Sequence, residues 1–141
     1  MPASTFPLPL VHAPAGFPSP AEDYIDQRLD LNEHLVRNPP STYFIRVQGD
    51  SMRGAGIASG DLLVVDRSVE PRPGHVVVAA VDGELTVKRL KRLGAGLALA
   101  PENPDYAPVP LDGERGVEIW GVALHVIHPL TPGGGGRWNS R

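Results

Sequence analysis

From Thr42 onward, the chain is a series of short apolar runs separated by residues that turn the backbone, and this pattern constrains the fold most. Polarity alternates residue by residue from Tyr43 to Gln48, as in a strand with one covered face. Asp82-Gly83 stands between two further runs, and this dipeptide is a strong signal for a tight hairpin. Several short strands with turn residues between them indicate a mostly β domain. The expected strands are residues 42–48, 62–65, 75–81, 85–90, 97–100 and 117–127.

Three parts are expected along the chain: an extended N-terminal arm at residues 1–20, a folded domain at 21–130 and a flexible tail at 131–141. The arm contains six prolines, each of which fixes φ, lacks a backbone N–H donor and pushes the preceding residue towards extended geometry. The tail contains four consecutive glycines. We therefore place the hydrophobic core in the middle part alone.

A short helix is expected near the start of the domain. Asp30 followed by Glu33 fits a capping box, and the helix should run through Leu35 and stop before two prolines. His34 lies on this helix and is expected at the surface.

Composition excludes several classes of protein. With 41% hydrophobic and 21% charged residues, the 141-residue chain fits one soluble globular domain. The net charge of -3 argues against a protein whose main task is to bind the phosphate backbone of nucleic acid, because such proteins usually carry a basic surface, and no direct sequence-specific DNA binding is expected. The absence of cysteine excludes disulfides, thiolate zinc sites and cysteine nucleophiles. The longest apolar run, Val76 to Val81, is far shorter than the roughly 20 residues of a spanning helix. A secretory signal is not expected, because the N-terminal residues contain no Lys or Arg and no continuous apolar stretch. A cytoplasmic protein is expected.

Ser51 and Lys88 are the residues whose combination indicates chemistry. Taken alone, Ser51 is a turn residue in a glycine-rich loop, and Lys88 is part of a solvated basic strand. A serine nucleophile needs a neighbouring base, for which histidine or a neutral lysine are the common choices here. The strand period of two puts Lys88 on one face with Thr86 and Leu90. Such a face permits the desolvation that keeps a lysine neutral.

Three ordered segments resemble the LexA/UmuD family of serine–lysine peptidases, also called peptidase S24. Residues 49–66, which include Gly49-Asp50-Ser51-Met52, resemble the serine box of that family, and residues 82–88 resemble its lysine box. Upstream, the sequence of residues 15–21 resembles the cleavage region of UmuD. The resemblance extends over residues 13–128.

This resemblance implies a compact LexA-type domain of short, strongly bent strands that acts as a serine endopeptidase on its own chain. Ser51 would be the nucleophile, Lys88 the general base and the Ala15–Gly16 bond the substrate, with the arm lying in the cleft as an added strand. The backbone N–H groups of Asp50 and Ser51 would form the oxyanion hole, and no metal or other cofactor is implied. Pro14 departs from the family pattern because it removes one possible strand hydrogen bond from the arm.

The role implied by the resemblance is the UmuD-like one. Fifteen residues precede Gly16, which we expect to be too few for the DNA-binding module of a LexA repressor. Signal peptidases of related chemistry need a membrane anchor, and no apolar run in this sequence is long enough to be one. Cleavage would occur in the SOS response to DNA damage, stimulated by the RecA–single-stranded-DNA filament. The shortened protein, a homodimer, would be the accessory subunit of an error-prone, UmuC-like Y-family translesion polymerase. The alternatives are a non-catalytic polymerase-binding subunit, a fragment of a LexA-like repressor, and a peptidase that acts on other proteins.

Other polar or aromatic residues are expected to have structural roles. His125 and His128 would point to opposite faces of a strand, which excludes a shared metal site. Asp61 and Asp66 flank a strand and are interpreted as turn and end residues and not as an acid pair. Trp120 alternates with Ile119 and is interpreted as a packing residue.

Overall fold

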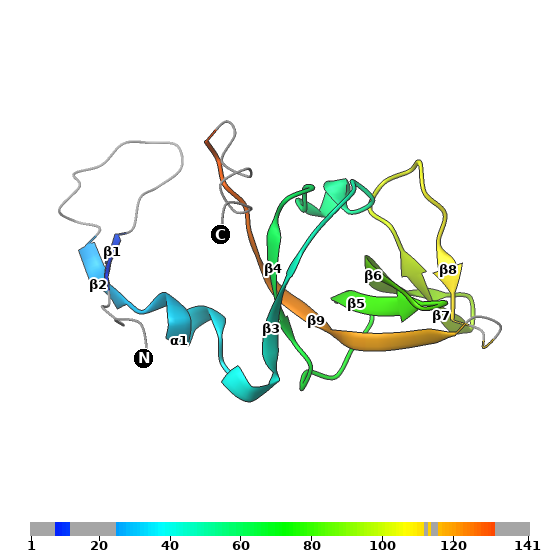
Figure 1. The fold of residues 1–141 in the computed structure, drawn as a ribbon, viewed down its shortest axis with the longest axis horizontal. Coiled ribbons are helices and arrows are strands. Elements are labelled where there is room, and N and C mark those ends of the chain that lie inside the picture. Colours follow the sequence, from blue (N-terminus) through cyan, green and yellow to red (C-terminus); the bar gives the residue numbers. More distant parts are fainter. Residues whose placement is uncertain (1–7, 12–24, 112, 114–115, 132–141) are drawn as a thin grey trace. The chain divides into compact units, whose positions relative to one another are not determined.

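The computed structural model describes residues 8–11, 25–111, 113 and 116–131 (Figure 1). The chain divides into two units, residues 1–37 and 38–141, and each is described by itself. The predicted cleavage bond Ala15–Gly16 and most of the predicted tail lie outside the described residues. The domain boundaries expected after residues 20 and 130 stay predictions.

The first unit contains a two-stranded antiparallel sheet. Strand β1 (Leu8–Val11) pairs with β2 (Ile25–Leu29), with Leu8 opposite Leu29 and an irregularity between Leu10 and Val11. Residues 8–11 are therefore extended, as expected for the arm. Their pairing with β2 was not predicted, because the mixed polarity of residues 25–29 shows no clear strand period.

Helix α1 (Leu31–Leu35) follows this sheet and confirms the predicted start and end. The Asp30 carboxylate accepts a hydrogen bond from the N–H of Asn32 at 3.0 Å, as an N-cap does. His34 is exposed, as expected. No helix among the described residues is long and apolar enough to cross a membrane.

A seven-stranded antiparallel sheet forms the second unit, in agreement with the predicted mostly β fold (Figure 1). Its order is β3-β4-β9-β5-β6-β7-β8, and two short 3₁₀ turns, η2 (Pro39–Ser41) and η3 (Arg53–Ala55), flank β3. The strands are β3 (Thr42–Arg46), β4 (Leu62–Asp66), β5 (Val76–Val81), β6 (Glu84–Leu93), β7 (Gly96–Ala100), β8 (Val109–Pro110) and β9 (Val117–Ile127).

The long strand β9 joins two halves of this sheet. Its C-terminal half pairs with β4 and its N-terminal half pairs with β5. The register shifts between Val64 and Val65 in β4, and between Val78 and Ala79 in β5, mark bulges or irregularities in both ladders. Because a bulge bends a strand and increases its twist, the sheet can fold around two cores.

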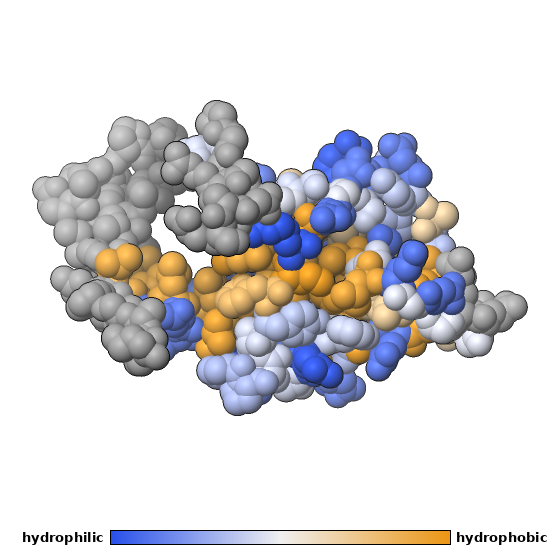
Figure 2. Space-filling view, in the orientation of Figure 1, coloured by the Kyte–Doolittle hydropathy of each residue, from blue (hydrophilic) through white to orange (hydrophobic). Residues whose placement is uncertain are grey.

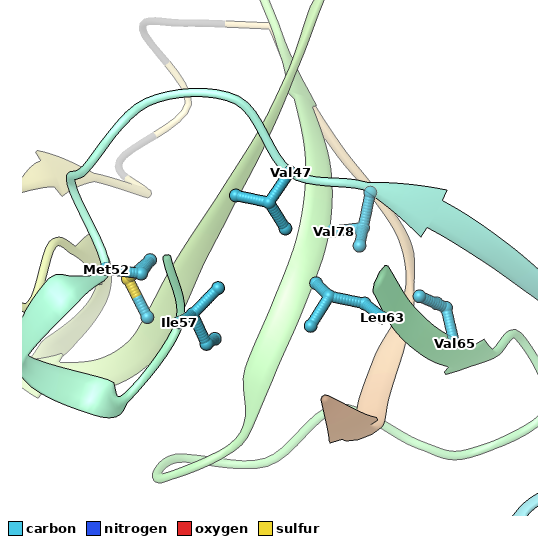
Figure 3. Close-up of a cluster of buried hydrophobic side chains, with 6 residues drawn as sticks. All are labelled: Val47, Met52, Ile57, Leu63, Val65 and Val78. Atoms are coloured by element: carbon cyan, nitrogen blue, oxygen red, sulfur yellow. The ribbon is translucent and has the colours of Figure 1, made fainter. Parts of the chain in front are cut away.

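Two clusters of buried apolar side chains lie on opposite sides of β5. Neighbouring residues alternate between them: Val78 belongs to the first cluster and Val77 to the second. Figure 3 shows the first cluster, in which side chains from the strands meet Met52 and Ile57 from the loop after β3. The core therefore anchors this loop on both sides of its 3₁₀ turn. The first cluster contains Val47, Met52, Ile57, Leu63, Val65 and Val78, and the second Val77, Ala79, Leu90, Leu99 and Val122.

The predicted hairpin at Asp82-Gly83 is confirmed. Both residues have positive φ, 51° and 87°, as the two central residues of a type I′ turn require. The turn sets the register of β5 and β6, in which Val77 lies opposite Lys88. This register determines where Lys88 lies in the sheet.

Candidate active site

The structure brings Ser51 and Lys88 into direct contact. Lys88 lies on β6 and Ser51 on the loop after β3, and Lys88 Nζ donates a hydrogen bond to Ser51 Oγ at 2.9 Å. Both side chains are half-buried. A hydroxyl and an amine at this distance can exchange a proton directly.

Lys88 is held by a second hydroxyl as well. Its Nζ donates to Thr86 Oγ1 at 2.9 Å, as their shared strand face allows. Within the described part of the chain, no carboxylate forms an ion pair with this ammonium, and burial lowers the pKa of Lys88 below its ordinary value. Both features favour the neutral amine, which is the form that accepts a proton.

The backbone of the Ser51 loop is fixed at several points. Gly49 has φ of +92°, a conformation that side chains disfavour, and its N–H donates to Ser59 Oγ at 3.2 Å. Val47 connects the two ends of the loop through its backbone. Its carbonyl oxygen accepts a hydrogen bond from the N–H of Gly60 at 2.8 Å, and its N–H donates to Asp61 O at 2.9 Å. Met52, which follows Ser51, is buried in the core. The loop is therefore fixed both before and after Ser51.

The segment after β7 braces this loop through its backbone. The N–H of Glu102 donates to Ser51 O at 2.8 Å, and Glu102 O accepts from the N–H of Gly54 at 2.7 Å. A Cβ atom at Gly54 would lie 2.5 Å from Glu102 O, so only glycine permits this approach. The Glu102 carboxylate accepts from Arg89 Nε at 2.9 Å, which ties the segment to β6.

Two side chains of the same segment bind Asp50, the neighbour of the serine. Asn103 Nδ2 donates to Asp50 O at 3.0 Å, and Tyr106 OH donates to the Asp50 carboxylate at 2.7 Å. The hydrogen bond to Asp50 raises the pKa of Tyr106. Sequence reasoning missed Glu102, Asn103 and Tyr106, because no local pattern in residues 101–106 connects them with a serine some 50 positions earlier.

The two predicted oxyanion donors are available. Among the described residues, neither the N–H of Asp50 nor that of Ser51 donates to another protein group. They lie in the loop that borders a hollow of about 370 Å³. That hollow is lined by Ile45, Arg46, Val47, Gln48, Gly49, Ser51, Met52, Leu85, Thr86 and Val87.

A second hollow, of about 320 Å³, lies on the Lys88 side. Leu85 and Thr86 line both hollows, Ser51 lines the first and Lys88 lines the second, so each residue of the contact borders a hollow. The first hollow is also lined by Ile45 and Arg46 of β3, which is the edge strand of the seven-stranded sheet. An edge strand can accept an extended peptide through backbone hydrogen bonds.

The two aspartates have the structural roles expected of them. Buried Asp61 accepts from the N–H of Ala58 at 2.8 Å and contacts His128 Nδ1 at 2.6 Å. Buried Asp66, at the end of β4, accepts from Ser41 Oγ at 2.6 Å and from the N–H and Oγ of Ser68 at 2.8 and 2.7 Å. Each therefore closes a turn.

The interpretation of Trp120 as a packing residue is wrong, because its side chain is 43% exposed. Its neighbour Ile119 packs against the second core cluster, and the alternation of β9 turns Trp120 away from that cluster, at the register shift between β5 and β9. His125 lies in β9, and His128 follows that strand. Within the described ranges, no group of three or more His, Asp or Glu side chains could hold a metal ion.

Comparison with known proteins decides the family of the chain. Residues 9–124 match the family model described as Peptidase S24-like. The chain belongs to this family. Since the S24 family is one of serine peptidases, the chain is a serine peptidase domain, and the predicted membership of the LexA/UmuD group is confirmed.

Several S24 relatives match most of the chain. Protein SamA of Salmonella typhimurium is 48% identical over 125 residues, which cover 89% of this chain and 86% of SamA. Protein MucA of Escherichia coli is 46% identical over 129 residues, 89% of this chain and 88% of MucA. A LexA repressor of Bordetella petrii is 41% identical over 121 residues, which are 85% of this chain but 54% of the repressor. The chain thus resembles SamA and MucA over nearly their whole length, and the repressor over about half of its length.

Proposed function

We propose that the chain is a self-cleaving serine endopeptidase in which Ser51 is the nucleophile and Lys88 the general base. The observation that carries this proposal is the 2.9 Å contact between Lys88 Nζ and Ser51 Oγ in a half-buried setting. Burial lowers the pKa of Lys88, so the neutral amine is reached at a lower pH than for a free lysine.

The reaction follows from these positions. Neutral Lys88 takes the proton of Ser51 Oγ as that oxygen attacks the carbonyl carbon of Ala15. The negative charge that develops on the Ala15 carbonyl oxygen is stabilised by the N–H groups of Asp50 and Ser51. Protonated Lys88 then gives its proton to the nitrogen of Gly16, which becomes the free N-terminal amine of residues 16–141, while residues 1–15 stay attached to Ser51 as an ester. Water hydrolyses the remaining ester between Ala15 and Ser51, with Lys88 again as base.

The arm of residues 1–20 is the proposed substrate. Ser51 borders one hollow and Lys88 a second, and the edge strand β3 borders the first, which supports binding of an extended peptide as an added strand. Small side chains at Ala15 and Gly16 let the scissile bond approach Ser51 closely. Because the arm belongs to the same molecule or to a dimer partner, its effective concentration is high enough for a weakly active site to cut one bond.

The proposed biological role is the UmuD-like one. Membership of the S24 family supports a function in the SOS response, with cleavage stimulated by the RecA–single-stranded-DNA filament. The shortened product then acts in the cytoplasm as a homodimeric accessory subunit of a UmuC-like translesion polymerase. The near full-length match to SamA and MucA favours this role over that of a repressor fragment.

Intact-mass measurement of the purified protein tests the proposed function. Wild type is incubated at pH 10 alone, and at pH 7 with RecA filament assembled on single-stranded DNA, and Ser51→Ala is the control. We expect one cut, loss of residues 1–15 and N-terminal sequencing that starts at Gly16, with none of this in Ser51→Ala. A protein that stays whole under both conditions is instead a non-catalytic polymerase-binding subunit, and a new N-terminus other than Gly16 contradicts the assigned site.

A further inference from the structure

One peptide group links Asp50 to the nucleophile. It carries the carbonyl oxygen of Asp50 on one side and the N–H of Ser51, a proposed oxyanion donor, on the other. Because a peptide group is planar and trans, its N–H points opposite to its C=O. Whatever fixes the direction of the Asp50 carbonyl therefore also fixes the direction of the Ser51 N–H.

Asn103 binds this carbonyl from outside the loop. Its Nδ2 donates to Asp50 O at 3.0 Å, and its Oδ1 accepts from the N–H of Asp105 at 3.0 Å. The orientation of the amide is unambiguous, since Oδ1 must face a donor and Nδ2 an acceptor. The side chain of Asn103 is one of three buried polar or charged ones among the described residues, with 4% exposure. A buried amide with both ends bonded holds its partner rigidly.

The loop supplies only one further bond to the same carbonyl. The N–H of Arg53 donates to Asp50 O at 3.1 Å as part of the turn that starts η3. This bond lies within the loop and would move with it. Asn103 instead belongs to a segment that is also anchored outside the loop, because the carboxylate of the preceding Glu102 accepts a hydrogen bond from Arg89 Nε of β6 at 2.9 Å.

We propose that Asn103 is a positioning residue that aims the Ser51 N–H at the oxyanion, an inference that rests on the proposed function. Its amide fixes the plane of the Asp50–Ser51 peptide before substrate arrives. By donating to the carbonyl, it also polarises the peptide and strengthens the Ser51 N–H as a donor. A donor held in place in advance needs no reorganisation when charge develops. Asn103 does not touch the substrate in this scheme and acts only through the peptide.

Two substitutions at Asn103 test this, with Tyr106→Phe as a matched control. Asn103→Asp keeps the volume and the acceptor for the Asp105 N–H but replaces the donor with a carboxylate oxygen. Asn103→Ala removes both bonds without adding a charge. Tyr106→Phe removes a bond to the same Asp50, but at its side chain and not at the peptide. The pH–rate profile of self-cleavage and the melting temperature are measured for each full-length variant.

Both Asn103 variants should lower the plateau rate at high pH at least about tenfold, because losing one oxyanion donor costs about 10²–10³ in rate and misaligning it costs part of that. Asn103→Ala should leave the midpoint pH of the profile at its wild-type value, since Lys88 sets it, and Tyr106→Phe should change the plateau by less than about threefold.

A folded Asn103 variant with the wild-type plateau rate overturns the proposal. So does a midpoint shift in Asn103→Ala, because the residue would then act through Lys88. A wild type that does not cleave at all rejects the proposed function itself.

Discussion

The behaviour of Lys88 is decided by the few atoms around it. Two hydroxyl oxygens, of Ser51 and Thr86, accept from its Nζ at 2.9 Å each. Neither oxygen carries a charge, so neither stabilises the ammonium as a carboxylate would, and burial lowers the pKa of Lys88. The same contacts that orient the amine thus leave it able to lose its proton.

Thr86→Val tests the orienting role of the second hydroxyl. Valine keeps the branched shape but cannot accept the hydrogen bond from Nζ, so the amine can turn away from Ser51. A neutral hydrogen bond contributes about 1 kcal/mol, which corresponds to a fall of roughly five- to tenfold in the self-cleavage rate. The rate is measured by intact mass at pH 10, and rescue in Thr86→Ser, which restores the hydroxyl, is the control. A Thr86→Val protein that cleaves like wild type shows that Ser51 alone holds the amine.

At the level of elements, the Ser51 loop depends on close contact with the segment after β7. Gly54→Ala would place a Cβ atom 2.5 Å from Glu102 O, so one of the two backbones must move. We expect the free energy of unfolding to fall by about 1–3 kcal/mol, as in other overpacked sites. Chemical denaturation measures this, and Gly96→Ala is the control, because its new Cβ would meet nothing closer than 3.9 Å. Equal stability of the two variants would mean that the contact is not tight.

Asp66 links the beginning of β3 to the end of β4 and makes stability depend on pH. Hydrogen bonds from Ser41 and Ser68 lower the pKa of Asp66 below its ordinary value. A carboxyl whose pKa is lowered by folding stabilises the fold above its unfolded pKa, and this contribution is lost as the pH falls through the folded pKa. Asp66→Asn should therefore destabilise the protein at pH 7 and make much less difference near pH 2. Thermal melts of both proteins at the two pH values check this, and an equal loss at both would exclude the carboxylate as its cause.

Sequence reasoning succeeded for elements whose signal is local. The hairpin at Asp82-Gly83 and the capped helix start at Asp30 follow from residues that are neighbours in the chain. It failed for β8, because this strand has only two residues, one of them Pro110, and is recognisable only beside β7. It also failed for the pairing of β1 with β2, because strands of mixed polarity show no period that predicts a partner. Asn103 was missed for the same reason: its role depends on Asp50, which the fold alone brings near.

At the scale of the whole molecule, the seven-stranded sheet leaves apolar side chains in contact with water. Phe44 of β3 is 54% exposed, and Trp120 and Val126 of β9 are 43% and 38% exposed. Phe44 lies opposite Val64 and Val126 lies opposite Leu63, so Phe44 and Val126 point to opposite faces of the sheet. Figure 2 shows an apolar band over β3 and β9 on one face of this unit. Large apolar patches on a soluble protein are commonly covered by a partner. The apolar band in Figure 2 supports the proposed homodimer.

We therefore expect a dimer both before and after cleavage. Sedimentation at micromolar concentration should give a species of twice the 15.1 kDa chain mass for the intact protein. The same ratio should hold for the cleaved form, because the exposed side chains lie outside the part that is removed. Phe44→Glu, which puts a charge on the apolar surface, should weaken the dimer. A single 15.1 kDa species for wild type at this concentration contradicts the expectation.

The central claim is that Ser51 is activated by a neutral Lys88, and the pH dependence of self-cleavage tests it most directly. Wild type, Ser51→Ala, Lys88→Ala and Lys88→Arg are followed by intact mass from pH 7 to pH 10. The wild-type rate should rise with pH as the neutral fraction of Lys88 grows, with a midpoint below the ordinary lysine pKa of about 10.4. All three variants should stay whole at every pH. Ser51→Ala lacks the nucleophile and Lys88→Ala lacks the base, and the guanidinium of Lys88→Arg stays protonated and accepts no proton from the serine. If Lys88→Ala cleaves itself at the wild-type rate, the lysine is not the base and the account is wrong.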